Sequence, residues 1–359
     1  MDPTKLIPTP DVIPAPSWLF LLLGLLTFLL HILVINVALG GSLITLFSRL
    51  KSESSLERDL HGAIASKLPV TFALGINLGV APLLFLQVIY GHLFYTSSVL
   101  LAVYWILVIP LLIIAYYGAY VHIRNYDSHK VLSRVALAIT SVILLYIGFI
   151  YVNNMTLMAQ PEKWNAYFAN RGGTFLNTAE PTLIPRYLHF VVASIAVAGL
   201  FSAIVWNFRK KKHPDLAPQK IKSGLQIFAI ATAVQMAVGF WFLLSLPRDI
   251  MLQFMGQNLT ATIFLFLGMV LAVVALIGGF LNKLSLALIH LLATIIVMVI
   301  LRAYLRSMYL RDSFHLGQLE MRPQYGVMIL FFIVLVIGLI IVGYMVKTAV
   351  KSEKEGAVA

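Results

Sequence analysis

The residues that invite chemistry are histidines inside apolar stretches. The clearest lies in PRYLHFVVASIAVAGLF, residues 185–201, where His189 follows Arg186 and Tyr187 and stands about one turn inside a long apolar run. An imidazole in hydrocarbon is costly unless another group takes its nitrogens, so ionisable residues inside a membrane are functional candidates. Haem iron is one such group, because histidine is a common axial ligand. We therefore predict that His189 ligates haem iron and that other membrane histidines belong to the same redox apparatus.

Small residues follow His189 on the same helix face. Ala193, Ala196 and Gly199 come four, seven and ten positions later, which places them on one side of a helix. Such a stripe suits a porphyrin lying against the helix, and it suits ordinary helix packing equally well.

A second histidine, His31, lies well inside the first apolar segment, in FLLHILVINVALGG. We predict that it also ligates haem iron; a hydrogen bond to a neighbouring helix is the alternative. Gly40 and Gly41 follow it. Glycines at these positions allow either a close approach of two helices or room for a flat macrocycle, and close approach is the commoner use.

Other residues are weaker candidates. His92, in YGHLFY, is either a further axial ligand or an interfacial histidine, and His290, in LALIHLLAT, is a buried axial candidate. Methionine can also ligate haem iron, although a methionine in a span more often serves packing. The methionine candidates for iron are Met236 and Met269. Four amides could bind haem carboxylates or a quinone carbonyl, or join helices: Asn153, Asn154, Gln226 and Gln235. Arg248 and Asp249 lie at the interface, where they either line a quinone site or pair with each other.

The composition fixes the class of protein. Of 359 residues, 60% are hydrophobic and 11% charged, whereas a soluble domain carries about 25% charged residues. The chain has no cysteine, which excludes disulfides, thiolate metal sites, covalent CxxCH haem attachment and cysteine-ligated iron–sulfur clusters within it. The net charge of +12 suggests contact with anionic lipid headgroups, and no nucleic-acid partner is expected.

Nine apolar segments are long enough to cross a bilayer. The sequence therefore predicts an all-α integral membrane protein with about nine transmembrane helices. A proline-rich irregular segment, 1–16, precedes them and a tail, 347–359, follows. We place the spans near 17–47, 68–90, 98–122, 134–153, 185–208, 223–246, 260–281, 284–305 and 325–346.

The distribution of Lys and Arg predicts orientation. With the N-terminus outside and the C-terminus in the cytoplasm, 17 of the 26 basic residues fall on the cytoplasmic side, as the positive-inside rule requires. RKKKH at 209–213 is the strongest contribution. The outer loops, 154–184 and 306–324, are then the natural docking surface for a partner. We expect a multi-pass protein of a prokaryotic cytoplasmic (inner) membrane.

Three stretches together resemble subunit I of the cytochrome bd quinol oxidases: HILVINVALGG at 31–41, KLPVTFALGINLGV at 67–80 and RYLHFVVASIAVAGLF at 186–201. The resemblance covers about residues 17–250, with further transmembrane helices in 251–346. It implies b-type haem, with His31 serving the oxygen-reducing haem pair and His189 ligating the low-spin haem b.

The chain also departs from that family. Tyr104 and Leu112 stand where the family has two glutamates, and Ala303 stands in place of a glutamate ligand. The GRQPW signature is absent, the quinol-binding loop is reduced to about 247–259, and the family's methionine aligns near Phe266, with Met269 one turn on. Much of the oxygen-reduction equipment is therefore missing.

We expect a membrane b-type cytochrome subunit of a respiratory complex, which passes electrons between the quinone pool and a periplasmic c-type cytochrome or similar redox partner. One alternative is a cytochrome bd-type terminal oxidase subunit with a divergent site. The other is a cofactor-free membrane anchor of a multisubunit complex.

Overall fold

The computed structural model describes residues 7–51 and 64–356, and in these ranges the chain is helical, with no strand. Nine of the described helices are long and apolar enough to cross a membrane, so the all-helical class and the number of candidate spans are confirmed, and the orientation of the termini stays a prediction. Residues 1–6 of the expected N-terminal segment and 357–359 of the expected tail lie outside the described ranges. The elements are α1 (Ser17–Lys51), α3 (Leu68–Leu100), α4 (Ala102–Arg124), α5 (Lys130–Met158), η2 (Pro161–Phe168), α6 (Leu183–Phe208), α7 (Ala217–Leu244), α8 (Arg248–Leu252), η3 (Gln253–Gln257), α9 (Leu259–Phe280), α10 (Leu284–Leu310), η4 (Leu316–Gln318) and α11 (Tyr325–Gly356).

Several boundaries differ from the sequence-based expectation, among them the end of the second span, because α3 continues to Leu100 and not to about residue 90. Helix α10 continues to Leu310, so the loop expected from residue 306 begins five residues later, and α11 continues to Gly356 through most of the expected tail. The residues of 301–310, LRAYLRSMYL, mix good helix formers with apolar side chains, and nothing in them stops a helix. The extension places Arg306 inside a helix instead of a loop.

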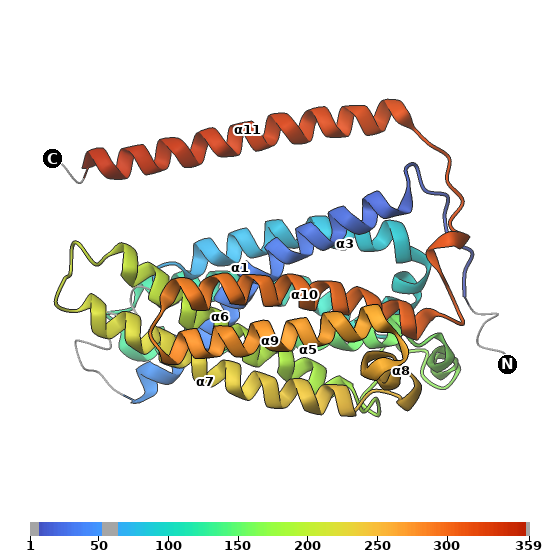
Figure 1. Ribbon diagram of the computed structural model, residues 1–359, viewed down its shortest axis with the longest axis horizontal. Coiled ribbons are helices and arrows are strands. Elements are labelled where there is room, and N and C mark those ends of the chain that lie inside the picture. The colour runs from blue at the N-terminus through green and yellow to red at the C-terminus, as the bar shows by residue number, and fades with distance from the viewer. Residues whose placement is uncertain (1–6, 52–63, 357–359) are drawn as a thin grey trace.

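Successive spans alternate in direction, so α1, α4, α6, α9 and α11 begin at the same end of the bundle. We call it the N-terminal end; α3, α5, α7 and α10 finish there. Figure 1 shows α1 and α11 both starting at the right-hand side of the view.

Glycines bring three of the helices into backbone contact. A Cβ on Gly40 would lie 1.9 Å from the carbonyl oxygen of Ser194, so α1 and α6 touch directly at this point. A Cβ on Gly224 would lie 2.7 Å from the carbonyl oxygen of Gly199, which brings α6 and α7 together. Small residues at helix crossings are the usual means of close packing in membranes, so Gly40 serves helix approach, the commoner of its two expected uses.

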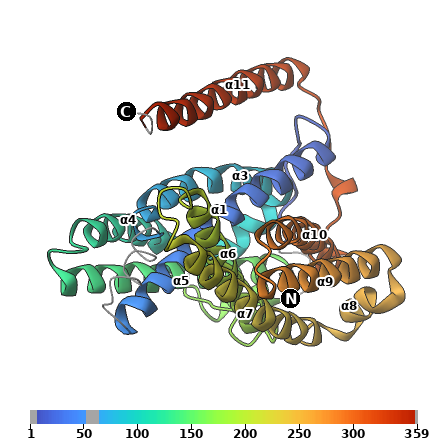
Figure 2. The same cartoon turned by 60° about the vertical axis from the view of Figure 1, so that its left-hand side comes forward.

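Helix α11 stands apart from the other helices in both views (Figures 1 and 2). Its large apolar side chains are exposed, and no atom lies within 4 Å of the space beside Gly338 or Gly343. Its base is tethered, because the linker before it pairs with the N-terminal segment: the amide of Ile13 donates to the carbonyl of Glu320 (2.9 Å) and the amide of Arg322 to the carbonyl of Ile13 (3.0 Å). The exposed apolar surface of α11 is therefore available to contact lipid or another protein.

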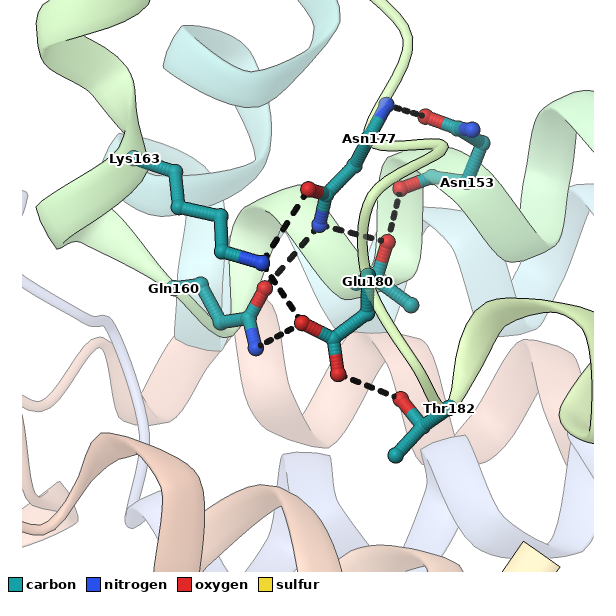
Figure 3. Close-up of polar contacts among 7 residues, drawn as sticks. Asn153, Gln160, Lys163, Asn177, Glu180 and Thr182 are labelled. Atoms are coloured by element: carbon teal, nitrogen blue, oxygen red, sulfur yellow. Dashed lines mark hydrogen bonds and ion pairs between the residues drawn. The ribbon is translucent and has the colours of Figure 1, made fainter. Parts of the chain in front are cut away.

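A buried polar network holds the long loop between α5 and α6 against the N-terminal end (Figure 3). Both oxygens of Glu180 are used: one accepts hydrogen bonds from Lys163 and Gln160, and the other accepts from Thr182. Asn177 ties this group to α5, because its backbone N–H donates to the side-chain oxygen of Asn153 (3.1 Å). Burial acts to raise the pKa of the Glu180 carboxyl, but these hydrogen bonds and the Lys163 charge outweigh it, so the pKa is lowered.

Candidate functional site

One large cavity runs through the bundle, with a volume of about 1150 Å³. Cavities for drug-sized ligands are typically about 300–1,000 Å³, so this one has room for a large cofactor. Its walls come from α1, α3, α4, α5, α6, α7, α9 and α10 and are mainly aliphatic and aromatic. The polar side chains that reach it are few.

His31 reaches the cavity from α1. Its Nδ1 lies 2.9 Å from the carbonyl oxygen of Gly75 on α3. Because a carbonyl can only accept, Nδ1 carries the proton and the lone pair is left on Nε2. The ring packs on Gly79, where a Cβ would lie 2.8 Å from Cε1 of His31. A carbonyl that fixes the tautomer in this way is the usual arrangement behind a metal-ligating histidine.

His189 reaches the same cavity from α6. Its ring packs on Gly239 of α7, where a Cβ would lie 3.2 Å from Cε1 of His189, and its Nδ1 is buried without a hydrogen-bond partner. Along the same helix, Ala193 and Ala196 line the cavity, whereas Gly199 packs on α7. The small-residue stripe therefore borders the cavity at Ala193 and Ala196 and serves helix packing at Gly199.

Three arginines line the cavity toward the N-terminal end: Arg186 from α6 and Arg302 and Arg306 from α10. Their guanidinium groups lie over aromatic rings, with Arg302 4.3 Å from the ring centre of Phe28 and Arg306 4.9 Å from that of Tyr90. Among the described residues none of the three forms an ion pair. Charges buried without a partner are costly, so this end of the cavity is suited to an anionic group.

Several of the weaker candidates also lie on the cavity. Met236, Met269 and Gln235 all line it, and the side-chain oxygen of Gln235 is buried without a partner. His92 and His290 do not line it. The His92 ring packs edge-on against Phe314 with a centroid distance of 4.7 Å, and Nδ1 of His290 lies 2.9 Å from the carbonyl oxygen of Leu286 on its own helix.

The remaining polar candidates serve other contacts. Asn153 belongs to the loop network, and Asn154 donates to the hydroxyl of Ser98 at 2.9 Å, so both amides join elements of the fold. Gln226 is exposed. Arg248 and Asp249 lie on α8, away from the cavity, and Asp249 pairs with Arg311 at 2.8 Å instead of with Arg248.

The cavity fits a haem. Two imidazoles face it, one with its tautomer fixed and one with an orphaned ring nitrogen. Each ring rests on a glycine of the next helix, and three arginines without acidic partners stand ready for the two carboxylates that haem carries. Through the described part of the chain, no three His, Cys, Asp or Glu side chains gather to hold a bare metal ion.

Sequence reasoning missed the arginines of α10 and the two supporting glycines. The sequence analysis placed Arg306 at the start of an outer loop and did not single out Arg302. Their spacing of four residues, next to an apolar run, nevertheless indicates two charges on one helix face. Gly79 and Gly239 carry no such signal, because only the packing shows which glycines contact a histidine ring.

The sequence matches no known family model, and comparison with curated proteins finds no significant relative.

Proposed function

We propose that this protein is a b-type cytochrome subunit of a membrane respiratory complex, which passes electrons between the quinone pool and a redox partner outside the membrane, such as a periplasmic c-type cytochrome. The observation that carries the proposal is the meeting of His31, His189 and three arginines without acidic partners on one cavity. Apolar walls with a few placed polar groups are typical of cofactor sites.

The residues divide the work of binding. Nε2 of His31 carries the lone pair that would bind iron, because the hydrogen bond from Nδ1 to the Gly75 carbonyl fixes the tautomer of the ring. His189 would ligate the iron of a second haem, and Met236 and Met269 line the same cavity. Arg186, Arg302 and Arg306 bind the haem carboxylates through charge-assisted hydrogen bonds. Haem, when bound, supplies reversible one-electron transfer.

Three sequence features support the same proposal. The resemblance to cytochrome bd subunit I rests on stretches that contain both cavity histidines. The positive-inside rule places the N-terminal end of the bundle outside, and with it the arginines and the loop network, so that a partner there would dock close to the cofactor. The absence of the family's glutamates favours electron transfer over oxygen reduction.

The test is spectroscopic. The purified native complex should show b-type bands in a reduced-minus-oxidised spectrum, and pyridine haemochrome should quantify the haem. His31→Ala and His189→Ala should each lower the haem content while the protein still inserts. His92→Ala and His290→Ala are matched controls, because both remove a membrane histidine that does not line the cavity, and they should leave the haem content unchanged.

Absence of b-type bands from the native complex would refute the proposal and favour a cofactor-free anchor. Unchanged haem content in His189→Ala would refute the assignment of that ligand. Oxygen consumption with quinol by the purified complex would favour the terminal oxidase instead.

A further inference from the structure

A set of residues faces both the cavity and the outside of the bundle. Val80 on α3 and Ile109, Ile113 and Tyr117 on α4 all line the cavity, yet they are 52%, 67%, 52% and 65% exposed. The other exposed lining residues in the described part of the chain are Tyr151 on α5 and Phe240 on α7, one on each helix. The cavity is therefore open to its surroundings mainly between α3 and α4.

This opening lies at the level of the hydrocarbon. Helices α3 and α4 both qualify as membrane spans, and they are consecutive, joined through Leu101. Val80 is 12 positions into α3, Ile109 is seven positions into α4 and Tyr117 is seven positions from its end, so all are more than one turn from a helix terminus. Water does not reach such a position, but molecules dissolved in the bilayer do.

We propose that the opening between α3 and α4 is a lateral portal through which a membrane quinol, with its isoprenoid chain, passes between the bilayer and the cavity. This inference rests on the proposed function and adds the route by which the substrate enters.

The depth of the portal selects among membrane molecules. A phospholipid carries a charged headgroup, and moving a charge to the middle of the bilayer is costly. A quinol headgroup is uncharged and can cross the opening together with its chain. Inside the cavity, the side-chain oxygen of Gln235 has no hydrogen-bond partner and is an acceptor suited to a quinol hydroxyl.

The chemistry is balanced by the proposed cofactor. Oxidation of one quinol to quinone breaks two O–H bonds and releases two protons and two electrons. The protons would go to water, and each of the two electrons would reduce one ferric haem, one held by His31 and one by His189. The portal residues take no part in this step, so changing them should alter the arrival of the substrate and not the haem itself.

Closing the portal tests the proposal with a matched control. Ile109→Trp and Ile113→Trp, combined, place two large side chains in the opening. Ile106→Trp and Ile114→Trp, combined, place the same side chains on α4 at positions that are 66% and 50% exposed but do not line the cavity. Both variants should show the native haem spectrum, which separates this test from that of the proposed function.

The kinetic readout is haem reduction in proteoliposomes by stopped flow. The probes are menaquinol and ubiquinol with full isoprenoid chains, and the corresponding headgroups without a chain. We expect the portal variant to be reduced about tenfold more slowly by the long-chain quinol that reduces the native protein, the effect of a barrier of about 1.4 kcal/mol. The chain-free headgroup, which is smaller, should be slowed less by the portal variant, and the control variant should behave as native protein with both. Equal rates for the portal and control variants with the long-chain quinol would overturn the proposal.

Photolabelling provides a readout that does not depend on redox activity. A long-chain quinone and a phospholipid, each with a diazirine in its chain, are incorporated into proteoliposomes, and the labelled peptides are identified by mass spectrometry. The quinone should label cavity-lining peptides in native and control proteins and lose that labelling in the portal variant. Labelling by the phospholipid that excess quinone fails to displace would show that a lipid chain occupies the opening, and would overturn the proposal. Absence of cavity labelling by the quinone would overturn it as well.

Discussion

The contact between Gly79 and His31 offers the sharpest test of the site. In Gly79→Ala the new methyl group would lie 2.8 Å from Cε1 and 3.0 Å from Nδ1 of the His31 ring, closer than such atoms can approach. The opposing atoms belong to a ring that is already hydrogen-bonded to the same helix, from Nδ1 to the Gly75 carbonyl of α3. The ring therefore has to leave that hydrogen bond, or α1 and α3 have to separate.

The magnitude follows from three opposing terms. Overpacking a well-packed site costs about 1–3 kcal/mol. Loss of the His31–Gly75 hydrogen bond adds about 0.5–1.5 kcal/mol. The better helix propensity of alanine returns about 0.5–1 kcal/mol. We expect a net loss of stability of roughly 2 kcal/mol from these terms, together with a displaced His31 imidazole.

Gly148 provides the matched control. It also lines the cavity, but a Cβ there would meet its nearest neighbour, on Tyr187, at an ordinary 3.8 Å. Gly239→Ala is intermediate, because the methyl group would lie 3.2 Å from Cε1 of His189, whose Nδ1 has no partner to hold the ring in place. Gly148→Ala should be neutral, Gly239→Ala mild and Gly79→Ala severe.

The assay is haem content per purified protein, measured beside the thermal unfolding midpoint in the same detergent. Gly79→Ala should lower both quantities, and Gly148→Ala should lower neither. Equal haem content and equal midpoints in these two variants would refute the reasoning, because the only difference claimed between the two glycines is the distance from the added methyl group to its neighbour.

Three further perturbations test the rest of the fold. Gly40→Ala would place a methyl group 1.9 Å from the Ser194 carbonyl oxygen, which forces α1 from α6 at a cost of about 3 kcal/mol or more, so size-exclusion chromatography should show little monodisperse protein. The pKa of Glu180 is lowered in the folded protein, so the ionised carboxylate stabilises the fold above the pKa of the unfolded chain, near 4.3. This stabilisation is lost as the pH falls through the folded pKa. The unfolding midpoint of the native protein should therefore drop in this acid range, and that of Glu180→Gln should start lower and change less. Truncation after Gln324 removes α11, which supplies no residue to the cavity, so the remaining protein should keep its haem content, and a loss of haem would contradict the separation of α11 from the site.

Much of the fold was predictable because a bilayer leaves few choices. Long apolar runs can only be helices there, and nine were counted from the sequence and nine described helices qualify. Helix boundaries were less predictable, because a helix can continue beyond the hydrocarbon. Nothing in LRAYLRSMYL, residues 301–310, shows that α10 continues to Leu310. The separation of α11 was not predictable at all, because its composition is that of any span. The backbone pairing of its linker with Ile13 and Pro14 is visible only in the structure.

The candidate site was predictable in its histidines and not in their surroundings. His31 and His189 stand out because an imidazole in an apolar run needs a reason, and the same argument selected His290, which the structure places off the cavity with a bond to its own helix. Sequence periodicity shows which face of a helix a residue occupies but not which helix lies opposite. The portal was even less predictable from the sequence. Ile106 and Ile109 are equally exposed isoleucines of one helix, and only Ile109 lines the cavity.

The unequal surroundings of the two histidines give the proposed electron transfer a direction. A hydrogen bond from the second ring nitrogen to a carbonyl makes an imidazole a more basic ligand, and His31 has this bond while Nδ1 of His189 has none. More basic ligation stabilises ferric iron, so the haem held by His31 should have the lower potential and should pass its electron to the haem held by His189.

His31 is 14 positions into α1 and His189 six positions into α6, which places them about 21 Å and 9 Å from the N-terminal end at 1.5 Å per residue. Electrons would therefore move toward the end where the outer partner is expected, and redox titrations of His31→Ala and His189→Ala should lose the lower and the higher midpoint, respectively. If the two variants lose the same midpoint, or the opposite ones, the hydrogen bond to Gly75 does not set the order.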